Sequence, residues 1–138
     1  LLGPTGHEIS GCCIQASTRD FARLGVFMLG GGMAGGKAVL PDDWIAKATT
    51  KHVGINFPDG RPVPERGYGY QWWTNDDGSY AAQGIFGQGI FIDPKRKLVI
   101  ATNSNWPRAT DPDTVGAQRE AFYKAVQAAV DAEAKKAG

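Results

Sequence analysis

The 138-residue chain lacks a long hydrophobic run and lacks an excess of either charge. Fifteen basic residues face fourteen acidic ones, and the only basic pair near the end is Lys135-Lys136, which we interpret as a solvated helix end. No apolar run approaches the roughly 18 residues of a membrane span, and no signal peptide is visible. We therefore expect neither a nucleic-acid partner nor a membrane span.

Cysteine and histidine are scarce as well. Cys12 and Cys13 are adjacent, and a bridge between neighbours is strained, so we interpret them as small buried hydrophobes. His7 and His52 each stand without a titratable partner at helical or hairpin spacing, which is typical of surface histidines. These patterns predict no metal and no organic cofactor.

Apolar residues make up 42% of the chain and charged residues 21%, which is typical of a globular domain. A helix capped by Ser17 or Thr18 is predicted to run to about Leu29. Its apolar stripe, at the i, i+3, i+4, i+7 spacing, is Phe21, Leu24, Gly25 and Met28. A second helix is predicted from Trp44 to about Thr49, with Pro41 in its first turn, and residues 51–66 as a long surface loop.

Beyond this loop the apolar period changes to two. We predict four strands, Tyr68–Thr74, Tyr80–Gly84, Gly89–Asp93 and Leu98–Asn103, with hairpin turns at 75–78 and 94–97. The aromatic residues of the first strand alternate between its faces, so that most of them pack in the core, and one tryptophan of the Trp72-Trp73 pair is a candidate for a pocket wall.

Asp111-Pro112 starts a final helix that is predicted to end near Lys135. Its apolar stripe would cover one face of the sheet and comprises Val115, Phe122, Val126, Ala129 and Val130. The predicted fold class is α+β: an antiparallel sheet meander with flanking helices and a C-terminal helix packed on the sheet. No repeat or linker divides the chain.

A glycine-rich run offers one motif to test. Gly31-x-x-x-x-Gly36-Lys37 satisfies a phosphate-loop pattern except at its last position, where Ala38 has no hydroxyl for Mg²⁺. A helix also precedes the run where a phosphate loop needs a strand. We interpret the glycines as a flexible turn between helices.

The segment Ala82-Gln83-Gly84-Ile85-Phe86-Gly87-Gln88 is the most informative of the chain. Gly84 allows a ligand to approach the backbone closely, and Ile85 can present its N–H as a hydrogen-bond donor. The alternative is a plain bulge in the strand, marked by Gly84 and Gly87.

With GYGYQWW at 67–73 and LVIATNSNWP at 98–107, this segment resembles the last strands of serine hydrolases related to class C β-lactamases and penicillin-binding proteins. STRDFARLG at 17–25 and VLPDDWI at 39–45 are similar to the esterase and 6-aminohexanoate-dimer hydrolase branch. The resemblance implies that Ala82, Gln83 and Gly84 stand where the family has Lys-Thr-Gly. It implies an oxyanion donor at the Ile85 N–H and a place for His7 at the substrate rim. Alanine at 82 cannot attract a carboxylate, which disfavours a true β-lactamase.

The family's nucleophile is missing from the chain. The resemblance implies catalysis by Ser-x-x-Lys with a tyrosine, yet none of the four serines has a lysine three positions later: Ser10, Ser17, Ser79 and Ser104. We therefore expect residues 1–138 to be the C-terminal portion of a β-lactamase-like serine hydrolase that acts on small ester or amide substrates.

Such a portion is expected to need the missing N-terminal half or to self-associate, in a compartment that stays open between bacterial cytoplasm and periplasm. The alternative is a non-catalytic binding module of the same fold.

Overall fold

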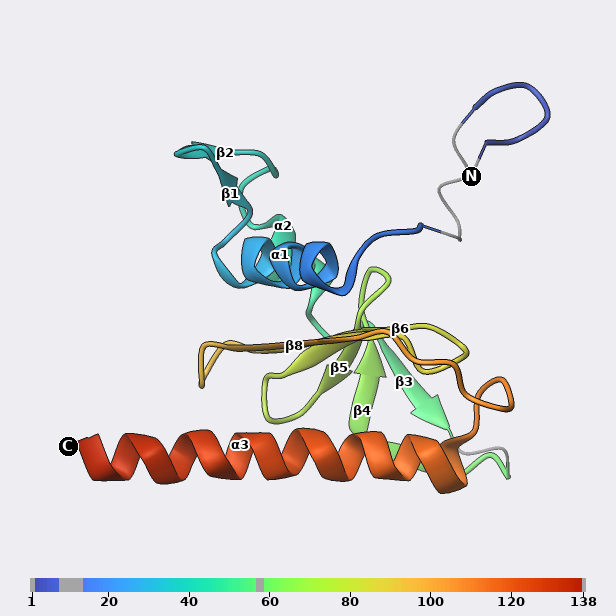
Figure 1. The fold of residues 1–138 in the computed structure, drawn as a ribbon, viewed down its shortest axis with the longest axis vertical. Helices are drawn as coiled ribbons and strands as arrows, with labels where there is room; N and C mark the ends of the chain where they lie inside the picture. The colour runs from blue at the N-terminus through green and yellow to red at the C-terminus, as the bar shows by residue number, and fades with distance from the viewer. Residues whose placement is uncertain (1, 8–13, 57–58, 138) are drawn as a thin grey trace.

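The computed structural model describes residues 2–7, 14–56 and 59–137. It has three layers, shown in Figure 1: helix α1 on one face of a sheet, the sheet itself, and the long helix α3 on the other face. The sheet has six strands in the order β3-β4-β5-β6-β7-β8, and each neighbouring pair is antiparallel. The predicted α+β meander with a C-terminal helix on the sheet is confirmed. None of the described helices is long and apolar enough to cross a membrane.

Helix α1 spans Thr18–Leu29 and begins as predicted. The Ser17 hydroxyl accepts a hydrogen bond from the Asp20 backbone N–H at 3.2 Å, which satisfies one of the free donors of the first turn. Gly25 is buried against Val99 and Ile90 of the sheet, and glycine is required there because a β-carbon would collide with both side chains. Leu24, expected in the buried stripe, is instead 43% exposed.

The remaining elements before the main meander are short. A hairpin of β1 (Met33–Ala34) and β2 (Lys37–Ala38) replaces the turn expected from the glycine-rich run. Helix α2 spans Trp44–Ala48, close to its predicted bounds, but Asp43 caps it and Pro41 lies outside its first turn.

The prediction of a loop over residues 51–66 is wrong. β3 (Val53–Asn56) and β4 (Pro62–Tyr68) form a hairpin there, with a register shift between Gly54 and Ile55. The prolines of β4 indicated a loop because proline cannot donate to a ladder. They are tolerated because β5 pairs only with residues 66–68, so the proline half of β4 meets the edge strand β3 alone.

A single strand over Tyr68–Thr74 is also wrong. The chain turns after Tyr68, and β5 covers only Trp73–Asn75. Gly69 makes this turn because it lies directly against the Ala48 carbonyl at the end of α2, where a β-carbon would collide. Trp72 packs with Tyr80 in the core on the α1 side, whereas Tyr70 is 47% exposed, so the aromatic residues do not alternate along one strand.

The last three strands are close to their predictions: β6 (Tyr80–Gln83), β7 (Gly89–Asp93) and β8 (Leu98–Thr102). Every residue of β7 is buried. On the α1 side the core contains Met28, Tyr80, Ile90 and Ile92. On the α3 side it contains Ala81, Phe91 and Tyr123.

Helix α3 (Ala117–Ala137) follows a π-helical turn, η1 (Pro112–Gly116). Asp111 caps this turn, which confirms the predicted start. The predicted stripe is wrong at Phe122, which is 50% exposed, while its neighbour Tyr123 is 2% exposed and stacks on Phe91. Ala129 is exposed as well, whereas Val115, Val126 and Val130 are half-buried, so the predicted stripe is wrong only at Phe122 and Ala129.

Candidate active site

The turn between β6 and β7 is held closed by its own backbone. The Gly84 N–H donates to the Gln88 carbonyl at 2.8 Å, and the Gly87 N–H donates to the Gly84 carbonyl at 3.2 Å. Gly87 has a φ of +87°, which a residue with a β-carbon adopts only under strain. The segment that the sequence singled out is therefore a defined hairpin turn that follows a buried strand.

Two backbone N–H groups of this turn, those of Ile85 and Gln88, have no acceptor among the described residues, and of the two only Ile85 lines the cavity described below. The Ile85 carbonyl accepts from the Thr110 N–H at 2.8 Å, and the Phe86 N–H donates to the Gln88 side-chain oxygen at 3.3 Å. No described residue accepts a hydrogen bond from the Ile85 N–H. Ile85 is 58% exposed, so this donor is free to meet a ligand.

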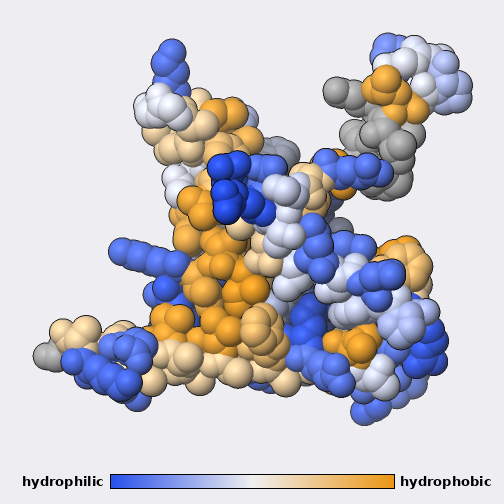
Figure 2. Space-filling model, in the orientation of Figure 1, coloured by the Kyte–Doolittle hydropathy of each residue, from blue (hydrophilic) through white to orange (hydrophobic). Residues whose placement is uncertain are grey.

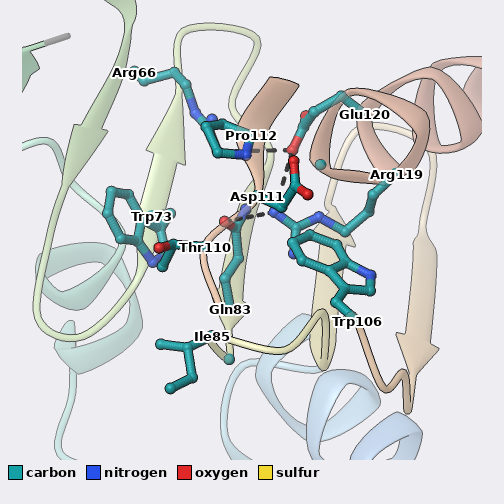
Figure 3. A pocket seen from close by; sticks show the side chains of 12 residues that line it. Arg66, Trp73, Gln83, Ile85, Trp106, Thr110, Asp111, Pro112, Arg119 and Glu120 are labelled. Carbon is teal, nitrogen blue, oxygen red and sulfur yellow. Dashed lines mark hydrogen bonds and ion pairs between the residues drawn. The ribbon is translucent and has the colours of Figure 1, made fainter. Parts of the chain in front are cut away.

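A cavity of about 300 Å³ lies beside the turn, on the α3 side of the sheet. Figure 3 shows its walls. The end of β6 and the turn contribute Gln83, Gly84 and Ile85, and the neighbouring strands contribute Arg66 and Trp73. The opposite wall comes from the segment that leads into α3 and from its first turn: Trp106, Thr110, Asp111, Pro112, Gly116, Arg119 and Glu120.

One chain of contacts crosses this cavity. The Arg119 guanidinium donates from Nη2 to the Gln83 side-chain oxygen at 2.9 Å and lies 4.8 Å from the centre of the Trp106 ring. Only 13% of the Arg119 side chain is exposed. Glu120 faces both Arg119 and Arg66 at 3.8 Å, so one carboxylate is shared by two cations (Figure 3). The Nε atoms of both arginines are buried without a hydrogen-bond partner among the described residues.

Asp111 fixes the segment where this wall begins. It is 6% exposed and accepts hydrogen bonds from the Thr114 hydroxyl at 2.8 Å and the Thr114 N–H at 3.2 Å. The hydrogen bond from the Thr114 hydroxyl holds the pKa of Asp111 below its usual value, against burial, and Arg108 at 2.9 Å acts in the same direction. The capping carboxylate therefore stays ionised at neutral pH.

The structure brings three of the five predicted site residues together at the cavity: Gln83, Gly84 and Ile85. Ala82 faces the other way and packs against the core on the α1 side. His7 is exposed, and its backbone carbonyl accepts a hydrogen bond from the Gly3 N–H. Cys12 and Cys13 lie outside the described residues.

Several cavity residues were missed by the sequence analysis. Arg66 and Arg119 belong to no motif, and their place depends on the packing of α3 across the sheet. Trp106 lies in LVIATNSNWP, a segment that carried the family resemblance but no predicted role. Of the Trp72-Trp73 pair, Trp73 lines the cavity.

The chemistry that these residues offer is the stabilisation of negative charge. A backbone N–H without a partner, beside a cavity, can donate to an oxygen that gains charge during acyl transfer. The chain offers no nucleophile to match, because no Ser-x-x-Lys occurs in it and Ser79 is buried and bonded to Asp77. Among the described residues, no group of three or more metal-ligating side chains exists.

Comparison with known proteins places the chain. The family model described as Beta-lactamase matches residues 11–124. A 6-aminohexanoate-dimer hydrolase of Paenarthrobacter ureafaciens is 34% identical over 115 residues, which cover 80% of this chain and 29% of that protein. A solved structure named "Putative 6-aminohexanoate-dimer hydrolase from Bacillus anthracis" superposes with a TM-score of 0.69 at 27% identity, over 89% of this chain and 31% of that one.

The chain thus spans about three tenths of the length of these relatives. The family match covers most of its residues, from before α1 into α3, and the superposition covers 89% of the chain. The chain belongs to the beta-lactamase family.

Proposed function

We propose that this chain is the C-terminal portion of a serine hydrolase that cleaves small ester or amide substrates through an acyl-enzyme. In the proposed reaction a serine from outside this chain attacks the substrate carbonyl, and water later releases the acyl group. Residues 1–138 supply the Ile85 N–H as an oxyanion donor. Gln83, Gly84 and Trp73 supply part of the pocket wall.

The free N–H of Ile85 is the observation that carries this proposal. The N–H groups of Gly84, Phe86 and Gly87 are engaged within the turn, whereas the Ile85 N–H has no acceptor among the described residues. The Gln88 N–H also lacks one, but only Ile85 lines the cavity. A donor aimed at a developing oxyanion contributes about 3–4 kcal/mol of transition-state stabilisation. Its function does not depend on a side chain, so the family's lysine is not required for it.

The substrate class follows from the side chains near the donor. By the family resemblance Ala82 stands in the lysine's position, and its side chain packs in the core on the α1 side. The strand end beside Ile85 therefore lacks the fixed charge that would attract a substrate carboxylate. We therefore propose neutral esters and amides, rather than penicillin-like acids, as the substrates.

The proposal also requires a further polypeptide, because this chain leaves an unusually large surface accessible to solvent for its mass. Its accessible area is 9445 Å², about 2,500 Å² more than the roughly 6,900 Å² typical of a folded monomer of its mass. Strand β8 (Leu98–Thr102) is at the edge of the sheet, where no other described strand pairs with its outer side, and its residues are only half-buried. Figure 2 shows hydrophobic side chains gathered between α1 and α3, where β8 runs. An exposed apolar edge of this kind favours association with another strand.

The first experiment expresses the complete reading frame and the 138-residue chain separately. With p-nitrophenyl acetate and butyrate, we expect turnover by the complete protein and none by the chain alone. An active-site serine in the complete protein should react with a fluorophosphonate probe. Turnover by the purified chain, or no labelling of the complete protein, would contradict the proposal.

The second experiment tests the oxyanion donor in the complete protein. Ile85→Pro removes the N–H, and we expect kcat to fall about 10²–10³-fold. Ile85→Ala is the matched control, because it removes the side chain and keeps the donor. Circular dichroism checks that both variants fold. Equal kcat values for the two variants would refute the role of the N–H.

A second candidate is a non-catalytic module of the same fold, which the absence of a Ser-x-x-Lys in the chain favours. Such a module would bind a partner at its exposed strand edge. Sedimentation of the chain separates the two candidates. A stable monomer with an ordered sheet favours the module, whereas concentration-dependent oligomers or rescue by the remaining segment favour the hydrolase portion.

A further inference from the structure

We propose that Trp106 is a positioning residue that fixes the direction of the Ile85 N–H. This inference rests on the proposed function, since a fixed donor matters for catalysis only if it meets an oxyanion. Trp106 follows β8 in the chain and approaches the Gly84–Gln88 turn with both its backbone and its side chain.

The backbone of the segment after β8 holds both carbonyls in the middle of the turn. The Trp106 N–H donates to the Phe86 carbonyl at 3.1 Å, and the Thr110 N–H donates to the Ile85 carbonyl at 2.8 Å. These two bonds fix the peptide planes that follow Ile85 and Phe86. The plane that carries the Ile85 N–H also contains the Gly84 carbonyl, which accepts from the Gly87 N–H at 3.2 Å, so the position of Gly87 determines the direction of the Ile85 N–H.

The indole ring of Trp106 fixes the same turn from a second direction. It lies directly against Gly87, where a β-carbon would collide with the ring, and Gly87 already has a positive φ. The ring also contacts the Arg119 guanidinium, 4.8 Å from its centre, and Arg119 holds the Gln83 side chain. One tryptophan therefore links the turn to the end of the strand that leads into it.

Two further bonds attach the turn to the same region. The Gln88 amide donates to the Ser104 carbonyl at 3.2 Å, and the Thr102 hydroxyl donates to the Gly87 carbonyl at 3.4 Å. A turn that contains two glycines and is exposed at Ile85 and Phe86 would otherwise sample many conformations. Catalysis by a donor requires that its geometry exists before the charge develops. The contacts of Trp106, together with these two bonds, hold the turn in one geometry before the charge develops.

The test uses Trp106→Ala and Trp106→Phe in the complete protein, with Trp44→Phe as the matched control. Trp44 lies on α2, is 41% exposed and contacts Tyr70 rather than the turn. Because a displacement of about 1 Å costs about 10²-fold in rate, we expect Trp106→Ala to lower kcat about 10–100-fold. KM should stay within about threefold, and Trp106→Phe should recover most of the loss. Trp44→Phe should leave both constants unchanged.

A second readout does not depend on turnover. Amide hydrogen exchange followed by NMR should show faster exchange at Gly87 and Thr110 in Trp106→Ala, while the Ile92 amide in β7 keeps its protection. Phenylboronic acid forms a tetrahedral adduct with an active-site serine, so its inhibition constant should rise with the loss in kcat. A positioning role predicts that the lower kcat, the faster amide exchange and the higher inhibition constant occur together.

The outcomes separate this inference from the proposed function. If the wild-type protein hydrolyses esters and Trp106→Ala changes only KM, Trp106 is a wall of the pocket and the positioning role is wrong. Unchanged exchange at Gly87 and Thr110, or unchanged kcat, overturns it as well. A wild-type protein without any turnover or probe labelling overturns the proposed function itself, and this inference with it.

Discussion

Replacing Asp93 by asparagine should destabilise the fold through one buried carboxylate. Asp93 ends β7 and is 1% exposed. Its Oδ2 accepts from Arg96 at 2.7 Å and from the Gln127 amide at 2.7 Å, and its Oδ1 accepts from the Arg96 N–H at 3.2 Å. Arg96 continues to Asp131 of α3 with two bonds, 2.9 and 2.8 Å long. The network therefore joins the β7–β8 turn to the helix.

The size of the effect follows from what asparagine cannot do. All the partners of Asp93 are hydrogen-bond donors, so the NH₂ group of an asparagine at this position would face a donor. The substitution also removes the negative charge that binds Arg96. Removing one partner of a buried ion pair costs about 3–5 kcal/mol. Because Arg96 keeps Asp131, we expect a loss near 3 kcal/mol, or a fall of about 10 °C in Tm.

The assay is urea unfolding of the complete protein, followed by far-UV circular dichroism at neutral pH. Asp131→Asn is the matched control, since it removes the other carboxylate of the same arginine. The Asp131 side chain is 48% exposed, so its loss should be much smaller. A free energy of unfolding for Asp93→Asn within about 0.5 kcal/mol of wild type would refute the reasoning, since it falls within the range of ordinary surface substitutions.

The same carboxylate gives a sign for the pH dependence. Burial alone would raise the pKa of Asp93, but the hydrogen bonds from Gln127 and Arg96 and the charge of Arg96 outweigh it and hold the pKa below its usual value. A carboxyl with a lowered pKa contributes stability above its unfolded pKa of about 3.9 and loses it as the pH falls through the folded value. The difference between wild type and Asp93→Asn should therefore shrink below about pH 4. A difference that grows with acid would contradict this assignment.

Three further substitutions test other contacts. Gly89→Ala would place a β-carbon 2.9 Å from the Tyr123 hydroxyl and 3.3 Å from the Thr102 hydroxyl, and we expect overpacking to cost about 1–3 kcal/mol in urea unfolding. Ser17→Ala removes the cap of α1 and should cost about 1 kcal/mol, whereas Ser17→Thr keeps the hydroxyl that caps the helix and donates to Asp20, and should retain most of the stability. Arg119→Met removes the donor to Gln83 and should lower stability by about 1–3 kcal/mol, with Arg23→Met of the exposed Arg23–Asp20 pair as a near-neutral control. Unchanged urea midpoints for Gly89→Ala, Ser17→Ala and Arg119→Met would show that these contacts contribute little.

The elements with local signals were predicted well from the sequence. Ser17 and Asp111 cap their helices as expected, and β7 has the predicted bounds, because caps and alternating strands depend on neighbouring residues. The β3–β4 hairpin was missed because its prolines favour loops, and only pairing with an edge strand makes them acceptable. Gly69 broke a predicted strand because of its contact with α2, which is distant in the sequence from β5.

The residues of the candidate site also separate into those with a local pattern in the sequence and those placed by contacts between distant elements. The Gly84-Ile85 step was found because glycine beside an apolar strand end is a local pattern, and the structure places it at a cavity. Arg119 and Trp106 complete that cavity, Arg119 because α3 packs across the sheet and Trp106 because the segment after β8 returns to the turn. On α3 the sequence predicted Phe122 at the sheet, but Tyr123 is the residue that packs there. Contacts made across layers leave no period in the sequence.

The attachment of α3 at two distant points has a consequence for engineering the chain. Near its N-terminal end Arg119 holds the strand that leads to Ile85, and near its C-terminal end Asp131 holds the turn between β7 and β8. Beyond Asp131 the helix extends past the sheet, as Figure 1 shows, and its described side-chain contact there is the exposed Glu133–Lys136 pair. A purification tag or a truncation placed after Asp131 should leave the turn between β6 and β7 undisturbed, whereas a truncation one helical turn earlier would remove the contact between Asp131 and Arg96.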